Sequence, residues 1–364
     1  MPILVDAHAD IAYTMLKYGR DYTCPVAETR ALEAGGHNVQ QNGDTLISWH
    51  DYQRGNIAVI FSTLFAAPIR FRTYDTETLV YKNFDEAHKL YSAQLDVYHR
   101  MQDSTPDKFR ILASKRDLEQ HLTLWQDAAT EAVSRPLGMV ILMEGAEAIR
   151  ELSELEMWHN RGVRLIGPAW VGTRYCGGWK EPGPLTDDGR KLLAAMSDFH
   201  FILDLSHMDE LAAAEALDIY DGPIVATHAN CAALMPNSNT NRHIPDRIIE
   251  GVIERGGVVG LVPFNSYLKV GWSRERGHSR EEVPLDVLAN HIDHVCQLAG
   301  DSLHAGIGSD FDGGFGAQSV PPEIDTVADL QKLVSLLQAR GYSEADTNNI
   351  LGGNWLTRLK RDLP

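Results

Sequence analysis

The sequence predicts an α/β protein folded as a closed (β/α)8 TIM-like barrel, and three observations favour this fold class. Eight short apolar runs alternate along the chain with segments of helical periodicity. The runs are continuous in Val, Ile and Leu, which is typical of parallel strands buried on both faces. No GxGxxG motif opens a helix, so the rival architecture, an open doubly wound sheet, lacks its usual nucleotide-binding signature.

The predicted strands begin at the amino terminus and continue into the last fifth of the chain. They occupy residues 3–5, 57–65, 138–143, 163–166, 201–205, 223–226, 258–262 and 305–308. Four stretches between them have apolar residues every three or four positions, which predicts helices over residues 77–101, 190–200, 208–219 and 285–298.

The domain organisation follows from what the sequence lacks. With no internal repeat, low-complexity tract or linker, residues 1–364 are expected to form one barrel domain. Residues 18–54 are expected to be an excursion after the first strand. The Gly- and Pro-rich residues 310–322 are expected to form a loop over the site.

Charge and cysteine content restrict the class of protein. The chain has 33 Lys and Arg against 50 Asp and Glu, a formal net charge of −17, which excludes nucleic acid and anionic membrane surfaces as partners. Four scattered cysteines without a CxxC pair, and an amino terminus without a basic, apolar leader, predict reduced thiols and a cytoplasmic protein. No stretch approaches the ~20 apolar residues that span a bilayer.

The first motif that can carry chemistry is Asp6-Ala7-His8-Ala9-Asp10, at the end of the first strand. The strand period of two predicts that Asp6, His8 and Asp10 share one face. Polar side chains in a barrel interior are costly unless they bind something, and a His and a carboxylate two residues apart can reach one metal ion. A polar strand end with Asp10 capping a helix is the alternative, and this motif alone leaves both interpretations open.

Three further strand ends repeat this placement. Glu144 follows the apolar run 138–143, His207 follows Leu203-Asp204-Leu205-Ser206, and His228 follows the run 223–226. A lone His at such a position is more often structural, but here the ends of parallel barrel strands meet at the carboxyl face. Three imidazoles and two carboxylates form the N/O ligand set that zinc accepts. If Glu144 bridges, two metals each have three protein ligands, an arrangement suited to metal-assisted hydrolysis.

Two loops supply candidates for the remaining roles. The last strand leads into Gly308-Ser309-Asp310-Phe311-Asp312-Gly313-Gly314. We assign proton transfer to Asp310 and a structural role in the turn to Asp312, although the two acids could exchange roles. Arg242, in the loop after His228, could hold a substrate carboxylate bidentately or could be a surface or anchoring residue.

In their order along the chain, these motifs resemble the membrane (renal) dipeptidase family, zinc-dependent dipeptidases built on an amidohydrolase-type barrel. The matching segments are DAHAD, MEG, LDLSH, THA, NRHIPD, GIGSDFDG and the GGN at residues 352–354. Each segment alone is weak, but the ordered set spans residues 6–354 and is specific. The resemblance implies two zinc ions, one held by His8, Asp10 and Glu144. The shared Glu144, with His207 and His228, would hold the second.

The resemblance also implies the reaction. A metal-bridging hydroxide would hydrolyse the peptide bond of dipeptides of the type L-X-L-X or L-X-D-X. Asp310 would be the proton-transfer group, and Arg242 would hold the terminal carboxylate of the substrate. Members of the family are commonly dimeric, so a homodimer is expected, with a small dipeptide or amide as the bound partner.

One position departs from the family pattern. Where the family has a His that contacts the substrate carbonyl oxygen, this sequence has Trp170, which we assign to the substrate-binding residues. An indole N–H donates one hydrogen bond but cannot become cationic. Either Arg174 or another group replaces the missing donor, or the enzyme acts on another amide. The alternatives are therefore an amidohydrolase for N-acyl amino acids, lactones or cyclic amides, and a metal-binding homologue that has lost catalysis.

Overall fold

A computed structural model describes residues 1–72, 77–127 and 135–364, and its central feature is a parallel barrel. The barrel strands are β1 (Leu4–Ala9), β2 (Ile57–Leu64), β6 (Leu137–Glu144), β7 (Val163–Gly167), β10 (Ile202–Asp204), β11 (Ile224–Val225), β12 (Val259–Leu261) and β13 (Ala305–Ile307). They are neighbours in the order β11-β10-β7-β6-β2-β1-β13-β12. A parallel bridge between Ala226 and Val259 joins the two ends of this order and closes the barrel. The predicted fold class and all eight predicted strands are confirmed.

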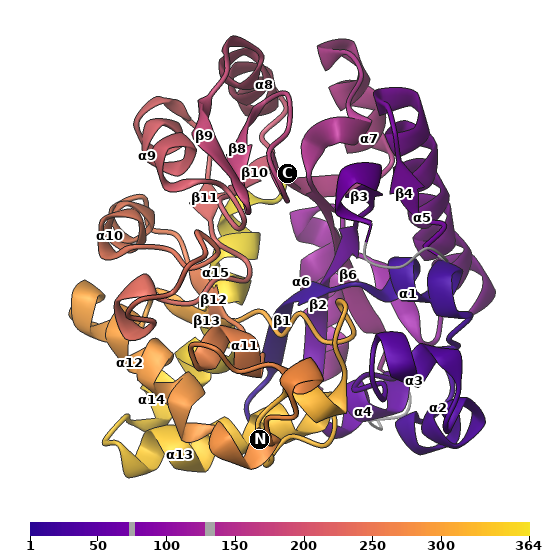
Figure 1. Ribbon diagram of the computed structural model, residues 1–364, viewed down its shortest axis with the longest axis vertical. Helices are drawn as coiled ribbons and strands as arrows, with labels where there is room; N and C mark the ends of the chain where they lie inside the picture. Colours follow the sequence, from indigo (N-terminus) through magenta and orange to yellow (C-terminus); the bar gives the residue numbers. More distant parts are fainter. Residues whose placement is uncertain (73–76, 128–134) are drawn as a thin grey trace.

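Helices surround the strands on the outside (Figure 1). The larger ones are α5 (Phe84–Ser104), α6 (Lys115–Gln126), α8 (Asp187–Asp198), α9 (Glu210–Ile219), α10 (Asp246–Glu254), α12 (Asp286–Ala299) and α15 (Asn354–Asp362). Short helices α1 (Ile11–Tyr18), α2 (Val26–Glu33), α3 (His37–Gln41) and α4 (Trp49–Arg54) fill most of the excursion after β1. Within the described ranges no helix has both the length and the apolar character needed to cross a membrane.

The sequence pattern misplaced the start of one helix. The apolar spacing predicted a helix from residue 77, but α5 begins at Phe84, where the side chain of Asn83 caps it by accepting from the backbone N–H of Glu86. Residues before this cap form the short strand β4 (Val80–Tyr81), which pairs with β3 (Ala67–Pro68). A further short strand, β5 (Phe109–Ile111), pairs with β6 beside the barrel and was not predicted.

The amino end of the barrel interior is filled by a compact apolar cluster. Strand residues that point inward, such as Val5, Phe61 and Leu142, pack there against side chains of α6 and α15. Both helices lie behind the strands in Figure 1 and close this end of the barrel. We call this set the inner cluster, and its main members are Val5, Ala7, Val59, Phe61, Val140, Leu142, Leu165, Leu118, Leu122, Trp355 and Leu359.

A β-bulge in β1 decides which of its side chains reach the interior. Asp6 pairs with Ile60 and Ala9 with Ser62, so β1 contains one residue more than β2 over this interval. Ala7 therefore packs in the inner cluster with Val5, whereas Ala9 packs with Leu4 in the layer between strands and helices. The expectation that Asp6 shares a face with His8 and Asp10 is wrong for this reason. The bulge leaves Asp6 on the outer side and turns His8 inward.

Candidate metal centre

The carboxyl end of the barrel brings together six ionisable side chains from the ends of β1, β6, β10, β11 and β13 and the loops that follow them. These side chains are at most 9 % exposed. They belong to His8, Asp10, Glu144, His207, His228 and Asp310. Two subsets could each hold an ion with their ligand atoms within 4.8 Å of one another: His8, Glu144 and His228, and His8, Asp10 and Asp310. The structure thus assembles all five predicted metal ligands and the predicted proton-transfer residue at one place.

Glu144 lies at the middle of this group, with its two oxygens facing different partners. Its Oε1 is 2.9 Å from Nε2 of His207 and 3.2 Å from Nε2 of His228. Its Oε2 is 3.7 Å from Nε2 of His8. A carboxylate with imidazoles facing both of its oxygens could serve as a metal ligand together with them.

Around Nε2 of His8 the donor atoms are spaced too widely for hydrogen bonds, whereas Nε2 of His207 lies within hydrogen-bonding distance of Glu144 and His228. Nε2 of His8 is 3.8 Å from Oδ2 of Asp10 and 3.8 Å from Oδ1 of Asp310. These separations are too long for hydrogen bonds. Ligands bonded to one tetrahedral zinc ion at about 2.0–2.1 Å lie roughly 3.3 Å apart, and Nε2 of His207 and His228 are separated by 3.0 Å.

Several of these atoms are buried without a partner. Within the described part of the chain, neither ring nitrogen of His8, nor Oδ1 of Asp10, nor Nδ1 of His207 has a hydrogen-bond partner. A buried polar atom left unpaired costs roughly 1–3 kcal/mol. Concentrating several of them at one point is consistent with ligands that a cation satisfies, so the residues present fit a metal centre.

The imidazoles are held in the form that binds metal. Burial, followed by the charge of Arg242, lowers the pKa of His8 to about 3. Burial also lowers the pKa values of His207 and His228 well below the ordinary range, and the neighbouring Arg242 charge acts in the same direction. All three rings are therefore neutral at pH 7 and offer a lone pair.

The carboxylates show the opposite perturbation. Burial, followed by the charge of Asp312, raises the pKa of Asp10 to about 7. Burial and the Asp10 charge raise the pKa values of Glu144 and Asp310 well above the ordinary range. Accumulated negative charge of this kind is relieved when a cation binds between the carboxyl groups.

Local backbone conformation aims two of the side chains. His207 and Asp310 have φ values of 66° and 57°, in the left-handed region that non-glycine residues seldom adopt. Such conformations persist only where the surroundings enforce them, and they concentrate at functional sites. At Gly313 a Cβ atom would lie 2.2 Å from Oδ1 of Asp310 and 2.6 Å from Oδ2 of Asp10, so only glycine admits both carboxylates.

A buried carboxylate beneath the centre orients His228. Oγ1 of Thr227 donates to Oδ2 of Asp204 at 2.5 Å and lies 3.0 Å from Nδ1 of His228. Oδ1 of Asp204 accepts from the backbone N–H groups of Thr227 and Ser206 at 2.9 and 3.0 Å. The Asp204 side chain thus fixes both of the loops that carry His207 and His228.

The Asp310 loop has comparable supports. Asp6 accepts from the backbone N–H and the hydroxyl of Ser309, both at 2.6 Å. Asp312 forms an ion pair with Arg20 at 3.0 Å and accepts from the backbone N–H of Leu46 at 2.9 Å. Asp312 is thus occupied by structural contacts, whereas Asp310 faces the cavity.

A cavity of about 270 Å³ opens onto the centre. Trp170 lies on its wall with Phe65, Phe71 and Trp179, and Tyr267 lines another part. Among the described residues lining it, Arg242 is absent. Arg242 is only 2 % exposed. Its guanidinium lies 5.0 Å from the Tyr267 ring centroid, and its Nη2 donates to the backbone carbonyl of His228 at 2.7 Å. Arg242 therefore lies beside Tyr267 and His228 without lining the cavity itself.

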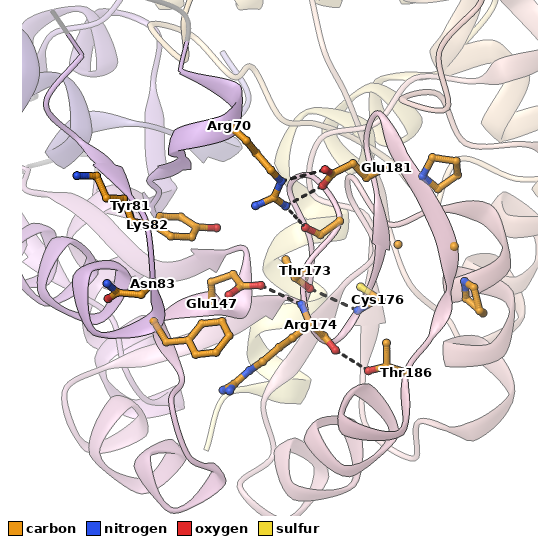
Figure 2. Close-up of a pocket in the computed structure, with 16 residues that line it drawn as sticks. Arg70, Tyr81, Lys82, Asn83, Glu147, Thr173, Arg174, Cys176, Glu181 and Thr186 are labelled. Atoms are coloured by element: carbon orange, nitrogen blue, oxygen red, sulfur yellow. Dashed lines mark hydrogen bonds and ion pairs between the residues drawn. The ribbon is translucent and has the colours of Figure 1, made fainter. Parts of the chain in front are cut away.

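Arg174 does not take the place of the missing family His. Its guanidinium is 4.2 Å from the Phe84 ring centroid and donates to the Tyr175 hydroxyl at 2.6 Å, in a neighbouring pocket of about 530 Å³ (Figure 2). That pocket also contains Glu147 and the Arg70–Glu181 ion pair. Of the alternatives for the missing donor, Arg174 is therefore set aside, because it lines this pocket and not the metal cavity, and another group or another substrate remains.

Several residues of the site escaped the sequence interpretation. Tyr267, Phe65 and Phe71 line the cavity, as do Lys17 and Glu77, whose side chains form an ion pair at 2.6 Å. None of them belongs to a motif with ligand spacing. Only the aromatic residue at the end of a predicted strand, Phe65, carried a usable signal, because strand ends meet at this face.

Comparison with known proteins places the chain in a family. A profile of the membrane dipeptidase family (peptidase family M19) matches residues 1–361. An uncharacterized protein in the pqqA 5′ region of Klebsiella pneumoniae is 33% identical over 234 residues, covering 62% of this chain and 82% of that protein.

Two solved structures have the same architecture. The dipeptidase AC, a metallopeptidase of family M19, superposes with a TM-score of 0.76 at 25% identity, covering 99% of this chain and 98% of the other. A metallopeptidase from Rhodobacter sphaeroides, liganded with a phosphinate mimic of L-Ala-D-Ala, has a TM-score of 0.76 at 23% identity over 100% of both chains. The chain belongs to the membrane dipeptidase family, peptidase family M19, and is a dipeptidase of that family.

Proposed function

We propose that this dipeptidase hydrolyses L-X-L-X and L-X-D-X dipeptides at a centre of two zinc ions. His8, Asp10 and Glu144 would hold one ion, and Glu144, His207 and His228 the other. The observation that supports this most directly is the convergence of buried, neutral imidazoles on the two oxygens of Glu144. When bound, zinc ions lower the pKa of a coordinated water and polarise the carbonyl that is attacked.

The chain's own residues account for proton transfer. Asp310 borders the cavity beside His8, where its carboxylate accepts a proton of the attacking water and passes it to the nitrogen of the leaving amino acid. The water oxygen forms the new bond to the carbonyl carbon as the C–N bond breaks. In the metal-free chain burial raises the pKa of Asp310, and a cation bound beside it would lower that pKa again, toward a range that suits both acceptance and donation of the proton.

Tyr267 and Arg242 would orient the substrate in the cavity. The terminal carboxylate lies toward Tyr267, beside which Arg242 supplies a buried positive charge and an Nε donor that has no partner among the described residues. A fixed guanidinium favours a carboxylate in this position. This charge helps to select small substrates that end in a free carboxylate.

The test is hydrolysis of an L-X-L-X and L-X-D-X dipeptide library by zinc-loaded protein, compared with Asp310→Asn and with Asp301→Asn, an exposed acid that serves as the control. We expect turnover by wild type and by Asp301→Asn. We expect a loss of roughly 10²–10⁴-fold in Asp310→Asn, with two zinc ions per chain in all three proteins by elemental analysis. A wild-type protein holding two zinc ions that hydrolyses no dipeptide would contradict the proposal.

Trp170 supports a second candidate substrate class. It stands on the cavity wall where the family has a His, so an N-acyl amino acid, lactone or cyclic amide could occupy the same space. The same assay decides between the two classes, because the second requires such compounds to be turned over faster than any dipeptide.

A further inference from the structure

One wall of the metal cavity is built from four aromatic rings that are each partly exposed. They come from three segments and are Phe65 at the end of β2, Phe71 in the 3-10 turn Ile69–Phe71, and Trp170 and Trp179 in the segment after β7. We call them the aromatic wall. The Trp170 ring centroid lies 5.0 Å from that of Phe65, 6.3 Å from that of Phe71 and 5.4 Å from that of Trp179.

The aromatic wall directly adjoins the metal centre. The ring centroids of Trp170 and Trp179 are each 6.3 Å from that of His207. A group held against these indoles is therefore close to the atoms that react. Partly exposed apolar rings grouped inside a cavity are typical of ligand contact surfaces, because covering them removes apolar area from water.

Polar contacts outside the cavity hold the wall together. Arg70, next to Phe71 in the chain, donates to Oε1 and Oε2 of Glu181 at 2.9 and 2.8 Å and to the carbonyl of Gly172 at 2.7 Å (Figure 2). Glu181 begins the strand β9 (Glu181–Leu185), close after Trp179. A bidentate pair of this kind has a defined geometry, so it fixes the Phe71 segment against the segment that carries both indoles.

The wall and Tyr267 line the same cavity but belong to separate groups of ring contacts. The ring of Tyr267 contacts His243 and Phe264. Within the described ranges, Trp170 makes ring contacts with the wall and His207 only, and no ring contact links the two groups. In the proposed orientation, with the carboxylate toward Tyr267 and the peptide carbon at the metal centre, the aromatic wall is the apolar part of the cavity that remains available to the amino-terminal side chain.

A neighbouring cation limits which side chains the wall accepts. Nζ of Lys180 lies 4.0 Å from the Trp179 ring centroid and 5.9 Å from that of Phe71. The Trp179 ring, which could attract a cationic side chain, is thus already in contact with an ammonium group. A second positive charge there would be repelled, whereas an apolar side chain would not.

We propose that the aromatic wall is the subsite for the side chain of the amino-terminal residue, and that it selects large apolar side chains such as those of Phe, Leu and Met. The direction of the substrate rests on the proposed function. The subsite itself rests on the four rings, their distance from His207 and the Lys180 contact.

The experiment measures kcat/KM of zinc-loaded protein for five dipeptides with a common carboxyl-terminal L-Ala and Phe, Leu, Ala, Gly or Lys at the amino terminus. We expect Phe and Leu to exceed Gly and Lys by about 10- to 100-fold. In Trp170→Ala this ratio falls to within about threefold of unity, and Trp179→Ala, which keeps Trp170, reduces it partially. Phe84→Ala removes a 39 % exposed ring in the neighbouring pocket and leaves the ratio unchanged.

A direct binding measurement separates this inference from the proposed function. Calorimetry of the zinc-loaded protein compares phosphinate dipeptide mimics that carry a benzyl or a methyl group at the amino-terminal position. If no dipeptide is hydrolysed but the benzyl mimic binds more tightly, and loses this advantage in Trp170→Ala, the subsite stands and the dipeptidase assignment falls. Equal binding of both mimics, hydrolysis without side-chain preference, or a preference that survives both Trp variants would overturn the subsite.

Discussion

The two ends of the barrel interior are equally buried but are filled in opposite ways. At the amino end, Phe61 and Trp355 pack with aliphatic side chains, and burial of apolar area stabilises the fold. At the carboxyl end, imidazoles and carboxyl groups such as His8 and Glu144 occupy the interior, and their desolvation opposes folding. The comparison teaches that burial alone does not reveal function in this protein. What distinguishes the functional end is a group of buried ionisable side chains, several of whose atoms lack a hydrogen-bond partner within the described residues.

The strongest test of this comparison is a large truncation at the amino end. Trp355 is 1 % exposed, and its ring centroid lies 5.2 Å from that of Phe61. Trp355→Ala is expected to lower the free energy of unfolding by about 3–5 kcal/mol, because it leaves a cavity. Zinc content and kcat of the folded protein should not change. Urea unfolding and steady-state kinetics at low temperature measure the two quantities.

The control for this variant is Leu303→Ala, since Leu303 is 51 % exposed and should change stability by no more than about 0.5 kcal/mol. If Trp355→Ala also lowers kcat of the folded protein, the amino and carboxyl ends of the barrel interior are not independent.

A smaller change at the carboxyl end should lower zinc affinity instead of stability. Thr227→Val removes the hydroxyl that links Asp204 to Nδ1 of His228 without changing the size of the side chain. Zinc affinity is expected to fall by about 10- to 100-fold, because the ligand loses its orienting contact. Competition with a chromogenic chelator measures this.

The matched variant is Thr347→Val, which removes a buried hydroxyl that donates to the carbonyl of Ser343, far along the chain from the centre. Unchanged zinc affinity in both variants would show that Thr227 has no role in orienting His228.

The smallest expected effect concerns pH. In the metal-free protein the pKa of Asp10 is raised to about 7 while that of His8 is lowered to about 3. Below pH 7 zinc must displace a proton from Asp10, whereas His8 stays neutral and does not compete. Glu144, whose pKa is also raised, must likewise lose its proton before it binds, so zinc affinity should rise steadily from pH 5.5 to 7. An affinity that is constant over this range would contradict the raised pKa of Asp10.

Much of this arrangement could be predicted from the sequence, for physical reasons that differ between residues. Continuous apolar runs located the eight barrel strands. Because the carboxyl ends of parallel strands meet at one face, the positions of Glu144, His207 and His228 after such runs predicted that they lie together. The orientation of Asp6 could not be predicted, because strict alternation fails where β1 gains a residue.

The aromatic wall could be predicted from the sequence only in part. Trp170 was identified because it departs from a family pattern, but Phe71 lies in a short 3-10 turn, Ile69–Phe71, whose placement depends on tertiary contacts. The ion pair between Arg70 and Glu181 joins residues 111 positions apart, and nothing local in the sequence signals it. Long-range contacts of this kind decide loop geometry and leave no periodic pattern.

The bulge in β1 makes the two ends of the barrel separable in protein engineering. Residues before it follow the packing alternation of the amino end, and residues after it follow a shifted alternation that serves the site. Redesign of Val5 or Ala7 can therefore proceed without turning His8 and Asp10 out of the interior. Deleting a single residue at this point would exchange the two faces and place His8 among the outer helices, so the strand tolerates substitutions here but not a change in length.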